Sequence, residues 1–240
     1  ASSMVLATVP WWRGLPRLIW AVIRAMKISI LGPTIPAIHG RGRWLNHWHV
    51  LGALNTVGKN CDIHPSAVVE GSRLGDNVTV GAHARVLLSD VGDGAHIMAG
   101  AQVETSVVGH QALVCQASGI RSCLLMPEAV ASQAWLQLSV LGRRAITTVG
   151  SLTMDLNFER PIRVPLDGSM HEVGREVLGA AFGHDVRVGT GVWVAPGRMI
   201  PNGVTVVRDP NQVLLGLPDN PKPGSYTIRC GSLVPLHEEE

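Results

Sequence analysis

One motif recurs three times in the middle of this chain. It reads Leu74-Gly-Asp-Asn-Val-Thr-Val80, then Val91-Gly-Asp-Gly-Ala-His-Ile97, then Val108-Gly-His-Gln-Ala-Leu-Val114, with a step of seventeen residues each time. A fixed period of this length means that one short unit is stacked on copies of itself. The motif returns more weakly from Leu141 and again from Phe182.

Three apolar columns keep this step, at intervals of six, six and five residues. A helix would place apolar residues three and four apart, so the spacing favours short strands separated by corners. The Gly and Asx residues after the first column suit corners, because Gly tolerates positive φ and Asx side chains form turns. A single turn of chain cannot bury its own inner face, so stacked turns pair their strands in parallel around one core. The columns are Val57, Leu74, Val91 and Val108; Ile63, Val80, Ile97 and Val114; and Val69, Val86, Val103 and Ile120.

The chain therefore resembles the hexapeptide-repeat, left-handed β-helix family over about residues 57–150 and 180–218. After Phe182 the columns even take pure hexapeptide spacing. The resemblance implies an all-β fold, a left-handed parallel β-helix of 17–18-residue coils. The left hand is the family's property, because the general rule for crossovers favours the right hand and nothing in the spacing overrides it.

Four regions follow from this pattern. We expect an N-terminal segment (1–56), a β-helix (57–218) that extrudes a loop late (151–181), and a C-terminal tail (219–240) with one strand at Tyr226–Arg229. Within the loop, Asp167-Gly168 between apolar residues predicts a tight hairpin. The register weakens after Leu125, where we expect Met126-Pro127 to interrupt it. A long loop that a compact stack extrudes is often functional.

Residues 10–31 of the N-terminal segment predict an amphipathic α-helix. Apolar residues recur there at helical spacing, and Arg13, Arg17, Arg24 and Lys27 gather on the other side. Two interpretations stay open: the helix packs on the β-helix or on a neighbouring subunit, or it lies in a membrane interface. After it, the Trp-rich lead-in holds His47 and His49, which would share one face of a strand without an evident third metal ligand.

The composition of the chain limits its possible partners and cellular locations. The 240 residues carry a net charge of +2, which gives no electrostatic case for binding nucleic acid. The four cysteines form no CxxC pair, which favours reduced thiols in the cytoplasm, with peripheral membrane attachment as the alternative. No stretch reaches the roughly 18 apolar residues that a membrane span needs.

The C-terminal half resembles the galactoside and maltose acetyltransferases. The similarity lies in the order of an extruded loop, hexapeptide coils, an Ala-Pro-Gly corner, a basic-Asp-Pro corner and a Gly-x-Pro segment. The resemblance implies a homotrimer in which coenzyme A lies along the outer face of the coils between two subunits. Carried over, it places Gly189, Ala195 and Gly197 beside the cofactor and Arg208 near a phosphate.

The general base is the point where the chain departs from those enzymes. They use a His just ahead of the loop to deprotonate the acceptor, but here Pro161–Pro165 contains no His. The candidates are His171, inside the hairpin, and His184, at the corner after it. Because His110 occupies the same motif position as His184, a corner preference favours a structural role for both.

Two other resemblances bear on function. The early coils look like the β-helical tails of sugar-phosphate nucleotidyltransferases, which would make the chain a non-catalytic trimeric scaffold held to a membrane or complex by its N-terminal helix. The γ-type carbonic anhydrases need three converging His. Since His83, His96 and His110 drift around the coil, no metal is expected. An acyltransferase and a scaffold therefore both remain open.

Overall fold

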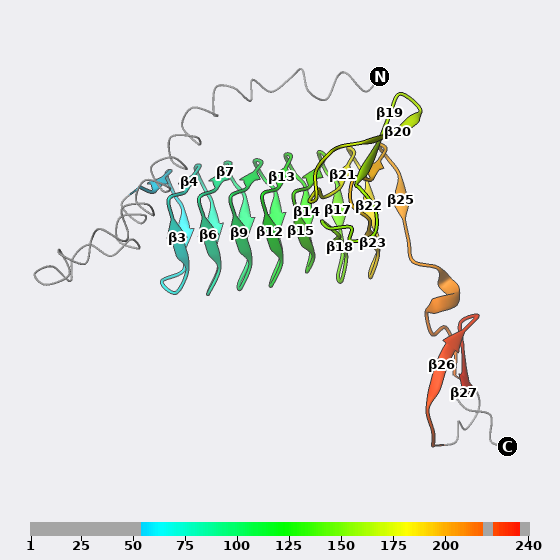
Figure 1. The fold of residues 1–240 in the computed structure, drawn as a ribbon. Coiled ribbons are helices and arrows are strands. Elements are labelled where there is room, and N and C mark those ends of the chain that lie inside the picture. The colour runs from blue at the N-terminus through cyan, green and yellow to red at the C-terminus, as the bar shows by residue number, and fades with distance from the viewer. Residues whose placement is uncertain (1–53, 218–222, 236–240) are drawn as a thin grey trace, which may run out of the picture.

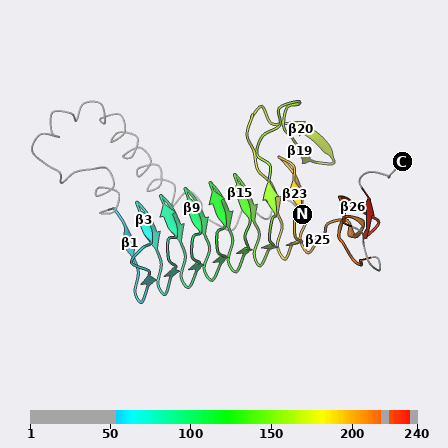
Figure 2. The same cartoon turned by 90° about the horizontal axis from the view of Figure 1, so that it is seen from below.

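The computed structural model describes residues 54–217 and 223–235. Most of these residues form a parallel β-solenoid, in which short strands are stacked coil upon coil from Thr56 to Val206 (Figures 1 and 2). The amphipathic helix predicted over residues 10–31 and the Trp-rich lead-in fall outside the described residues. Within the described ranges, no helix is long and apolar enough to cross a membrane.

Three parallel sheets make up the solenoid. The first holds β1 (Thr56–Val57), β4 (Arg73–Leu74), β7 (Asp90–Val91), β10 (Val107–Val108), β13 (Leu124–Leu125), β16 (Val140–Leu141), β21 (Ala181–Phe182) and β24 (Met199–Ile200). The second holds β2 (Asp62–Ile63), β5 (Thr79–Val80), β8 (His96–Ile97), β11 (Leu113–Val114), β14 (Val130–Ala131), β17 (Ile146–Thr147), β22 (Arg187–Val188) and β25 (Thr205–Val206). The third holds β3 (Val68–Glu70), β6 (Arg85–Leu87), β9 (Gln102–Glu104), β12 (Gly119–Arg121), β15 (Trp135–Gln137), β18 (Leu152–Thr153) and β23 (Trp193–Val194).

The three predicted apolar columns are confirmed residue by residue. Val57 pairs with Leu74 in the first sheet, and the second and third columns pair with the same seventeen-residue step. From the second coil onward the column residues point into the core, and Val91, Ile97 and Val103 are fully buried. Apolar burial in stacked coils is what stabilises the fold, because each coil covers the inner face of the next.

The register does change after Leu125, but its expected place at Met126-Pro127 is wrong. The Met126 amide still donates to the Leu141 carbonyl at 2.9 Å, and β13 pairs with β16 without a break. What changes is the step, which shortens to sixteen residues as Ile120 aligns with Leu136. The missing residue belongs to the corner between β14 and β15, so the columns stay in place while the corner tightens.

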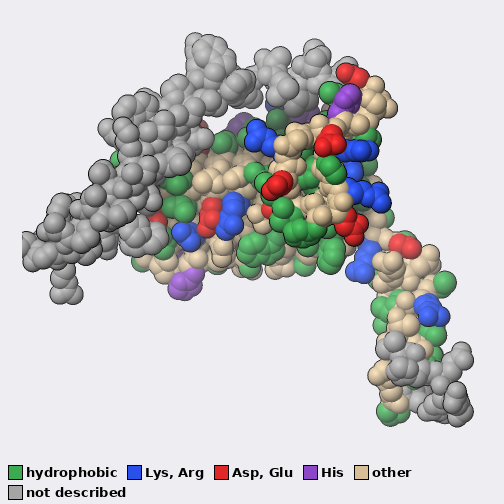
Figure 3. All heavy atoms as spheres, in the orientation of Figure 1, with side chains coloured by type: hydrophobic (Ala, Val, Ile, Leu, Met, Phe, Trp, Pro, Cys, Tyr) green, Lys and Arg blue, Asp and Glu red, His purple; other side chains and the backbone are tan. Residues whose placement is uncertain are grey.

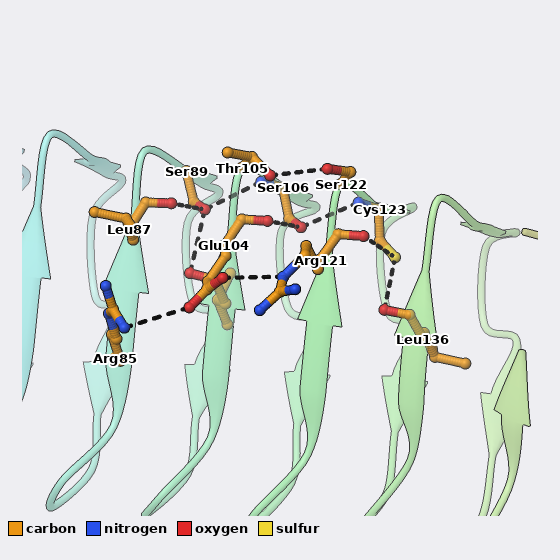
Figure 4. Close-up of polar contacts among 11 residues, drawn as sticks. Arg85, Leu87, Ser89, Glu104, Thr105, Ser106, Arg121, Ser122, Cys123 and Leu136 are labelled. Carbon is orange, nitrogen blue, oxygen red and sulfur yellow. Dashed lines mark hydrogen bonds and ion pairs between the residues drawn. The ribbon is translucent and has the colours of Figure 1, made fainter. Parts of the chain in front are cut away.

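A ladder of small polar residues closes the corner between the third and first sheets. The Ser89 hydroxyl donates to the Leu87 carbonyl at 2.7 Å and accepts from the Ser106 amide at 3.1 Å, and Ser106 repeats the pattern one coil later (Figure 4). Cys123 takes the next position, where its Sγ donates to the carbonyls of Arg121 and Leu136. Burial raises the pKa of this thiol to about 11, so it stays protonated at neutral pH.

Two hairpins project from the solenoid. The predicted hairpin is confirmed as β19 (Arg163–Leu166) and β20 (Ser169–Glu172), with positive φ at both turn residues, Asp167 and Gly168. Its loop leaves after β18 and returns before β21, and Leu156 bridges Val177, so the two ends of the loop lie side by side. After β25 come a 3₁₀ helix, η4 (Pro210–Gln212), and a second hairpin, β26 (Tyr226–Arg229) and β27 (Ser232–Pro235).

Candidate functional site

The excursion (residues 154–180) rests on the last coils through Gly197. A Cβ at Gly197, which has φ +72°, would lie 2.7 Å from the Arg163 carbonyl oxygen and 3.0 Å from Ile162 Cγ2. Arg198 Nη1 donates to the same carbonyl at 3.1 Å. Gly197 is therefore buried beneath the excursion. The backbone that passes close to Gly197 is that of the excursion itself.

A pocket of about 510 Å³ lies between the last corners of the second sheet and the C-terminal hairpin. Gly189 and Arg208, both expected beside coenzyme A, line it together. The opposite wall is apolar and comes from η4 and its flanks and from β26. The other lining residues are Thr190, Val207, Gln212, Val213, Leu214 and Ile228.

Arg208 sits at the edge of this pocket with an exposed guanidinium. Its Nε donates to Gln212 Oε1 at 3.3 Å, and its Nη1 would lie 3.3 Å from a Cβ on Gly191. The absence of a side chain at Gly191 thus leaves room for the guanidinium to lie along the corner. No carboxylate of the described residues forms a salt bridge with Arg208.

Ala195 lies elsewhere. It follows β23 on the third sheet, is exposed, and does not line the pocket of Gly189 and Arg208. Of the four residues expected near the cofactor, the structure brings Gly189 and Arg208 together and holds Ala195 and Gly197 apart from them.

His184 belongs to a corner ladder. Its Nδ1 accepts a hydrogen bond from the Arg143 amide at 2.9 Å, and its own amide donates to Asn202 Oδ1 at 2.7 Å. Asp93 does the same job earlier in the stack by accepting from the Asp76 amide at 2.8 Å. A neutral imidazole has one accepting nitrogen, so the occupied Nδ1 leaves Nε2 as the protonated nitrogen.

His171 is placed differently. Its Nε2 lies 2.7 Å from the Ser169 hydroxyl, which donates to the Leu166 carbonyl at 3.2 Å. In the tautomer in which Nε2 donates to that hydroxyl, the Nδ1 lone pair is left without a partner among the described residues. His171 is exposed on β20, opposite Val164. It therefore has a basic nitrogen open to a substrate, whereas His184 does not.

The excursion encloses a second pocket, of about 380 Å³. Both arms of the loop contribute to it, and its charged side chains carry both signs. Sequence reasoning marked the loop as functional but assigned a binding role to none of these residues, since nothing in their spacing repeats. The lining residues are Asn157, Phe158, Glu159, Arg160, Pro161, Ile162, Glu172, Gly174, Arg175 and Glu176.

The histidines of the early coils lie apart. His96 is in β8 of the second sheet. His83, with φ +57°, lies one coil earlier, in the corner that follows β5. His110 follows β10 of the first sheet. Among residues 54–217 and 223–235, no three His, Cys, Asp or Glu side chains gather in a way that would hold a metal ion.

No family model and no curated protein matches this chain. Among solved structures, LpxA from Bacteroides fragilis, a UDP-N-acetylglucosamine acyltransferase, is 14% identical over 65% of this chain and 68% of its own, with a TM-score of 0.49. PerB from Caulobacter crescentus, solved with CoA and GDP-perosamine, is 23% identical over 64% of this chain and 54% of its own, with a TM-score of 0.24. A hexapeptide transferase family protein from Anaplasma phagocytophilum is 14% identical over 65% and 80% of the two chains, with a TM-score of 0.24.

At these identities and TM-scores the neighbours decide nothing about this chain. Its own coils, of about 17 residues each, form an all-β parallel β-solenoid. What this chain does is argued from its own residues.

Proposed function

We propose that this chain is an acyltransferase that draws its acyl group from coenzyme A and passes it to a hydroxyl or amine of a sugar-like or amine acceptor. The observation that carries the proposal is the pocket in which Gly189 and Arg208 meet. It lies at the last coils, the same end of the solenoid from which the excursion projects (Figure 1). The resemblance to the acetyltransferases, which depends on the sequence alone, places the same two residues beside coenzyme A.

The pocket fits the donor in shape and charge. Its walls are mainly aliphatic, which suits a pantetheine arm or an acyl chain, and about 510 Å³ is within the usual range for a small-molecule site. The exposed Arg208 guanidinium offers planar donors to a phosphate. Coenzyme A, when bound, supplies an acyl group activated as a thioester. Ala195 and Gly197 have no part in this pocket and are left out of the proposal.

His171 is the residue we assign as general base. Its open Nδ1 can take the proton from the acceptor's hydroxyl or amine, while the Ser169 hydroxyl orients the ring through Nε2. His184 is assigned a positioning role in the solenoid corner, since its Nδ1 is already hydrogen-bonded to the Arg143 amide. His171 does not line the charged pocket of the excursion, which Glu172 lines, because neighbouring side chains of β20 point to opposite faces of the hairpin. The proposed place for the acceptor is therefore the face of the hairpin that carries His171.

Assembly and location complete the proposal. A homotrimer follows from the family resemblance. A cytoplasmic location, with residues 10–31 on a membrane surface or a protein partner, follows from the sequence pattern. The competing scaffold function rests on that same N-terminal segment.

Donor binding is tested by calorimetry with acetyl-CoA and a longer acyl-CoA. We expect micromolar binding to the wild type and a loss of about tenfold, or 1.4 kcal/mol, in Arg208→Gln. Arg187→Gln is the matched control, because Arg187 is an exposed arginine in β22 outside the pocket. No binding at millimolar cofactor would overturn the acyltransferase proposal and favour the scaffold.

The base is tested by turnover once an acceptor is found. His171→Gln is expected to lower kcat by about 10²-fold or more. His184→Asn is the discriminating control. An asparagine should be tolerated at this position, because Asn202 already accepts the equivalent corner hydrogen bond one coil later. Full activity in His171→Gln with loss in His184→Asn would reverse the assignment.

A further inference from the structure

The outer face of the third sheet carries two exposed tryptophans in one row. Trp135 in β15 and Trp193 in β23 both pair with the intervening strand at Leu152. They are 54% and 68% exposed, whereas Leu152 between them is half-buried. Large aromatic side chains left this open on a regular sheet mark a binding surface.

The ring of Trp135 is held in a fixed position by a glycine. Gly119 is the residue next to it in β12, and a Cβ there would collide with the Cε3 and Cζ3 atoms of the indole. The ring therefore lies down over Gly119, and its other side is exposed. No ordering of a loop is needed to present this side, so the surface is preorganised.

Polar groups surround the ring at its edge. A shallow cavity of about 70 Å³ is lined by Gly119 and Trp135 together with Gln102, Glu104, Arg121 and Gln137. Glu104 accepts from Arg121 Nε at 3.1 Å and pairs with Arg85 at 3.5 Å, as Figure 4 shows. The site thus offers amide and guanidinium donors and amide and carboxylate acceptors beside an aromatic plane, with its charges largely paired.

We propose that this face binds a linear oligosaccharide, with one pyranose ring stacked on Trp135 and another on Trp193. The C–H face of a pyranose is apolar and its rim bears hydroxyls, which is the pattern of the site: an aromatic plane ringed by uncharged amides and paired charges. A site for a charged polymer would carry unpaired charge of one sign. The proposal does not depend on the proposed acyltransferase function.

The spacing of the two rings sets the length of the ligand. Strands of a parallel sheet are about 4.8 Å apart, so two strand steps separate the tryptophan backbones by about 10 Å, the span of two linked pyranose rings. The half-buried Leu152 keeps the space between the rings low and open. Three or more linked sugars are therefore expected to bind more tightly than one.

A second copy of this chain fits the face less well. The cores of protein–protein interfaces are depleted of charged residues, but here Glu104 and Arg121 line the cavity beside Trp135, and Glu104 also pairs with Arg85. Figure 3 shows basic and acidic side chains interspersed with hydrophobic ones on the face that the third sheet presents. This mixture favours a polar ligand.

The test uses the full chain with cello- and chito-oligosaccharides of one to six units, followed by tryptophan fluorescence and calorimetry. Binding is expected to strengthen with chain length and to fall by about tenfold in Trp135→Ala and in Trp193→Ala. Gly119→Ala, which displaces the ring without removing it, should weaken binding too. Leu124→Ala is the control, since Leu124 is an exposed leucine on the outer face of the first sheet.

Three outcomes would overturn the proposal. One is the absence of binding to any of these sugars at millimolar concentration. Another is binding that Trp135→Ala and Trp193→Ala leave unchanged. The third is a fall in sedimentation mass in either tryptophan variant, which would show that a second copy covers the face.

Discussion

The coils before the excursion and the excursion itself are built on opposite principles. In the coils, every apolar column residue from Leu74 onward meets an equivalent residue above and below, and Leu125 and Leu141 are fully buried. In the excursion, Ile162 is buried but Phe158 is 93% exposed. The comparison shows that the stack supplies the stability, while the excursion holds polar groups over its last coils.

The largest effect is expected from a core substitution in the stack. Leu125→Ala should lower the free energy of unfolding by about 2–5 kcal/mol, because it leaves a cavity between two coils that cannot collapse. Phe158→Ala in the excursion should change it by about 0.5 kcal/mol or less, since the ring is already in water. Urea denaturation followed by circular dichroism measures both. Equal losses in the two variants would erase the distinction between the regions.

The next effect depends on pH and concerns the corner ladder. The folded chain raises the pKa of Cys123 from 9.0 to about 11, so the folded state holds this proton more tightly than the unfolded state. The resulting stability is complete below pH 9 and is lost as pH rises through 11. Two pKa units correspond to about 2.7 kcal/mol, which sets the order of magnitude.

Cys123→Ser is the matched control for that loss. A serine at this position restores the hydroxyl that Ser89 and Ser106 use in the same ladder, and it does not titrate in this range. Between pH 8 and pH 11 the wild type should therefore lose more stability than the variant. Parallel pH profiles of the two proteins would show that the buried thiol is not the cause.

The repeat allowed the sequence to predict the coils in detail. Val57, Ile63 and Val69 define columns because each is replaced by another apolar residue seventeen positions later, and a period can be read without knowing any contact. The hairpin at Asp167-Gly168 could be predicted from its turn residues alone. A tight hairpin turn needs positive φ at two consecutive residues, which an Asp-Gly pair adopts readily.

The site could be predicted only in part, because one of its walls does not follow the repeat. Gly189 and Arg208 meet because β22 and β25 pair in consecutive coils, as the repeat implies, but the opposite wall from η4 and β26 has no counterpart in the spacing. Gly197 is one of the small residues expected beside a cofactor, yet the excursion occupies the space over it. The Trp135 platform was missed altogether, because it depends on a glycine in the neighbouring strand rather than on any motif.

Removing the excursion should change stability little. Leu156 and Val177 are bridged, so residues 157–176 can be replaced by Asn-Gly without moving either end. The free energy of unfolding is expected to stay within about 1 kcal/mol of the wild-type value. The shorter loop costs less entropy to close, and this gain offsets the loss of packing on Gly197. Acyl transfer should disappear, because the deletion removes His171 and the hairpin face that carries it. Collapse of the fold would mean that the excursion stabilises the last coils.

The smallest effect is expected from the ion pair that joins the coils on either side of the excursion. Arg144 donates from Nε and Nη2 to the two carboxylate oxygens of Asp185, at 2.7 and 2.8 Å, across 41 residues of chain. The hydrogen bond from Arg144 lowers the pKa of Asp185, so the pair stabilises the fold fully above the ordinary aspartate pKa of about 4, and this stabilisation is lost progressively as pH falls from there through the lowered pKa. Both side chains are about half exposed, so the gain is small and screened by salt.

Asp185→Asn isolates this charge because it leaves the backbone undisturbed. Asp185 has φ +58°, and Asn77, with φ +56°, occupies the same corner position in an earlier coil. We expect a slightly lower urea midpoint for the variant at pH 7 and low salt, a difference that shrinks as pH falls below about 4, and no difference in high salt. Arg144→Gln should give the same loss, and combining the two should add nothing further. A deficit that survives in high salt would show that the pair acts by fixing the register of the coils across the excursion rather than through its charge.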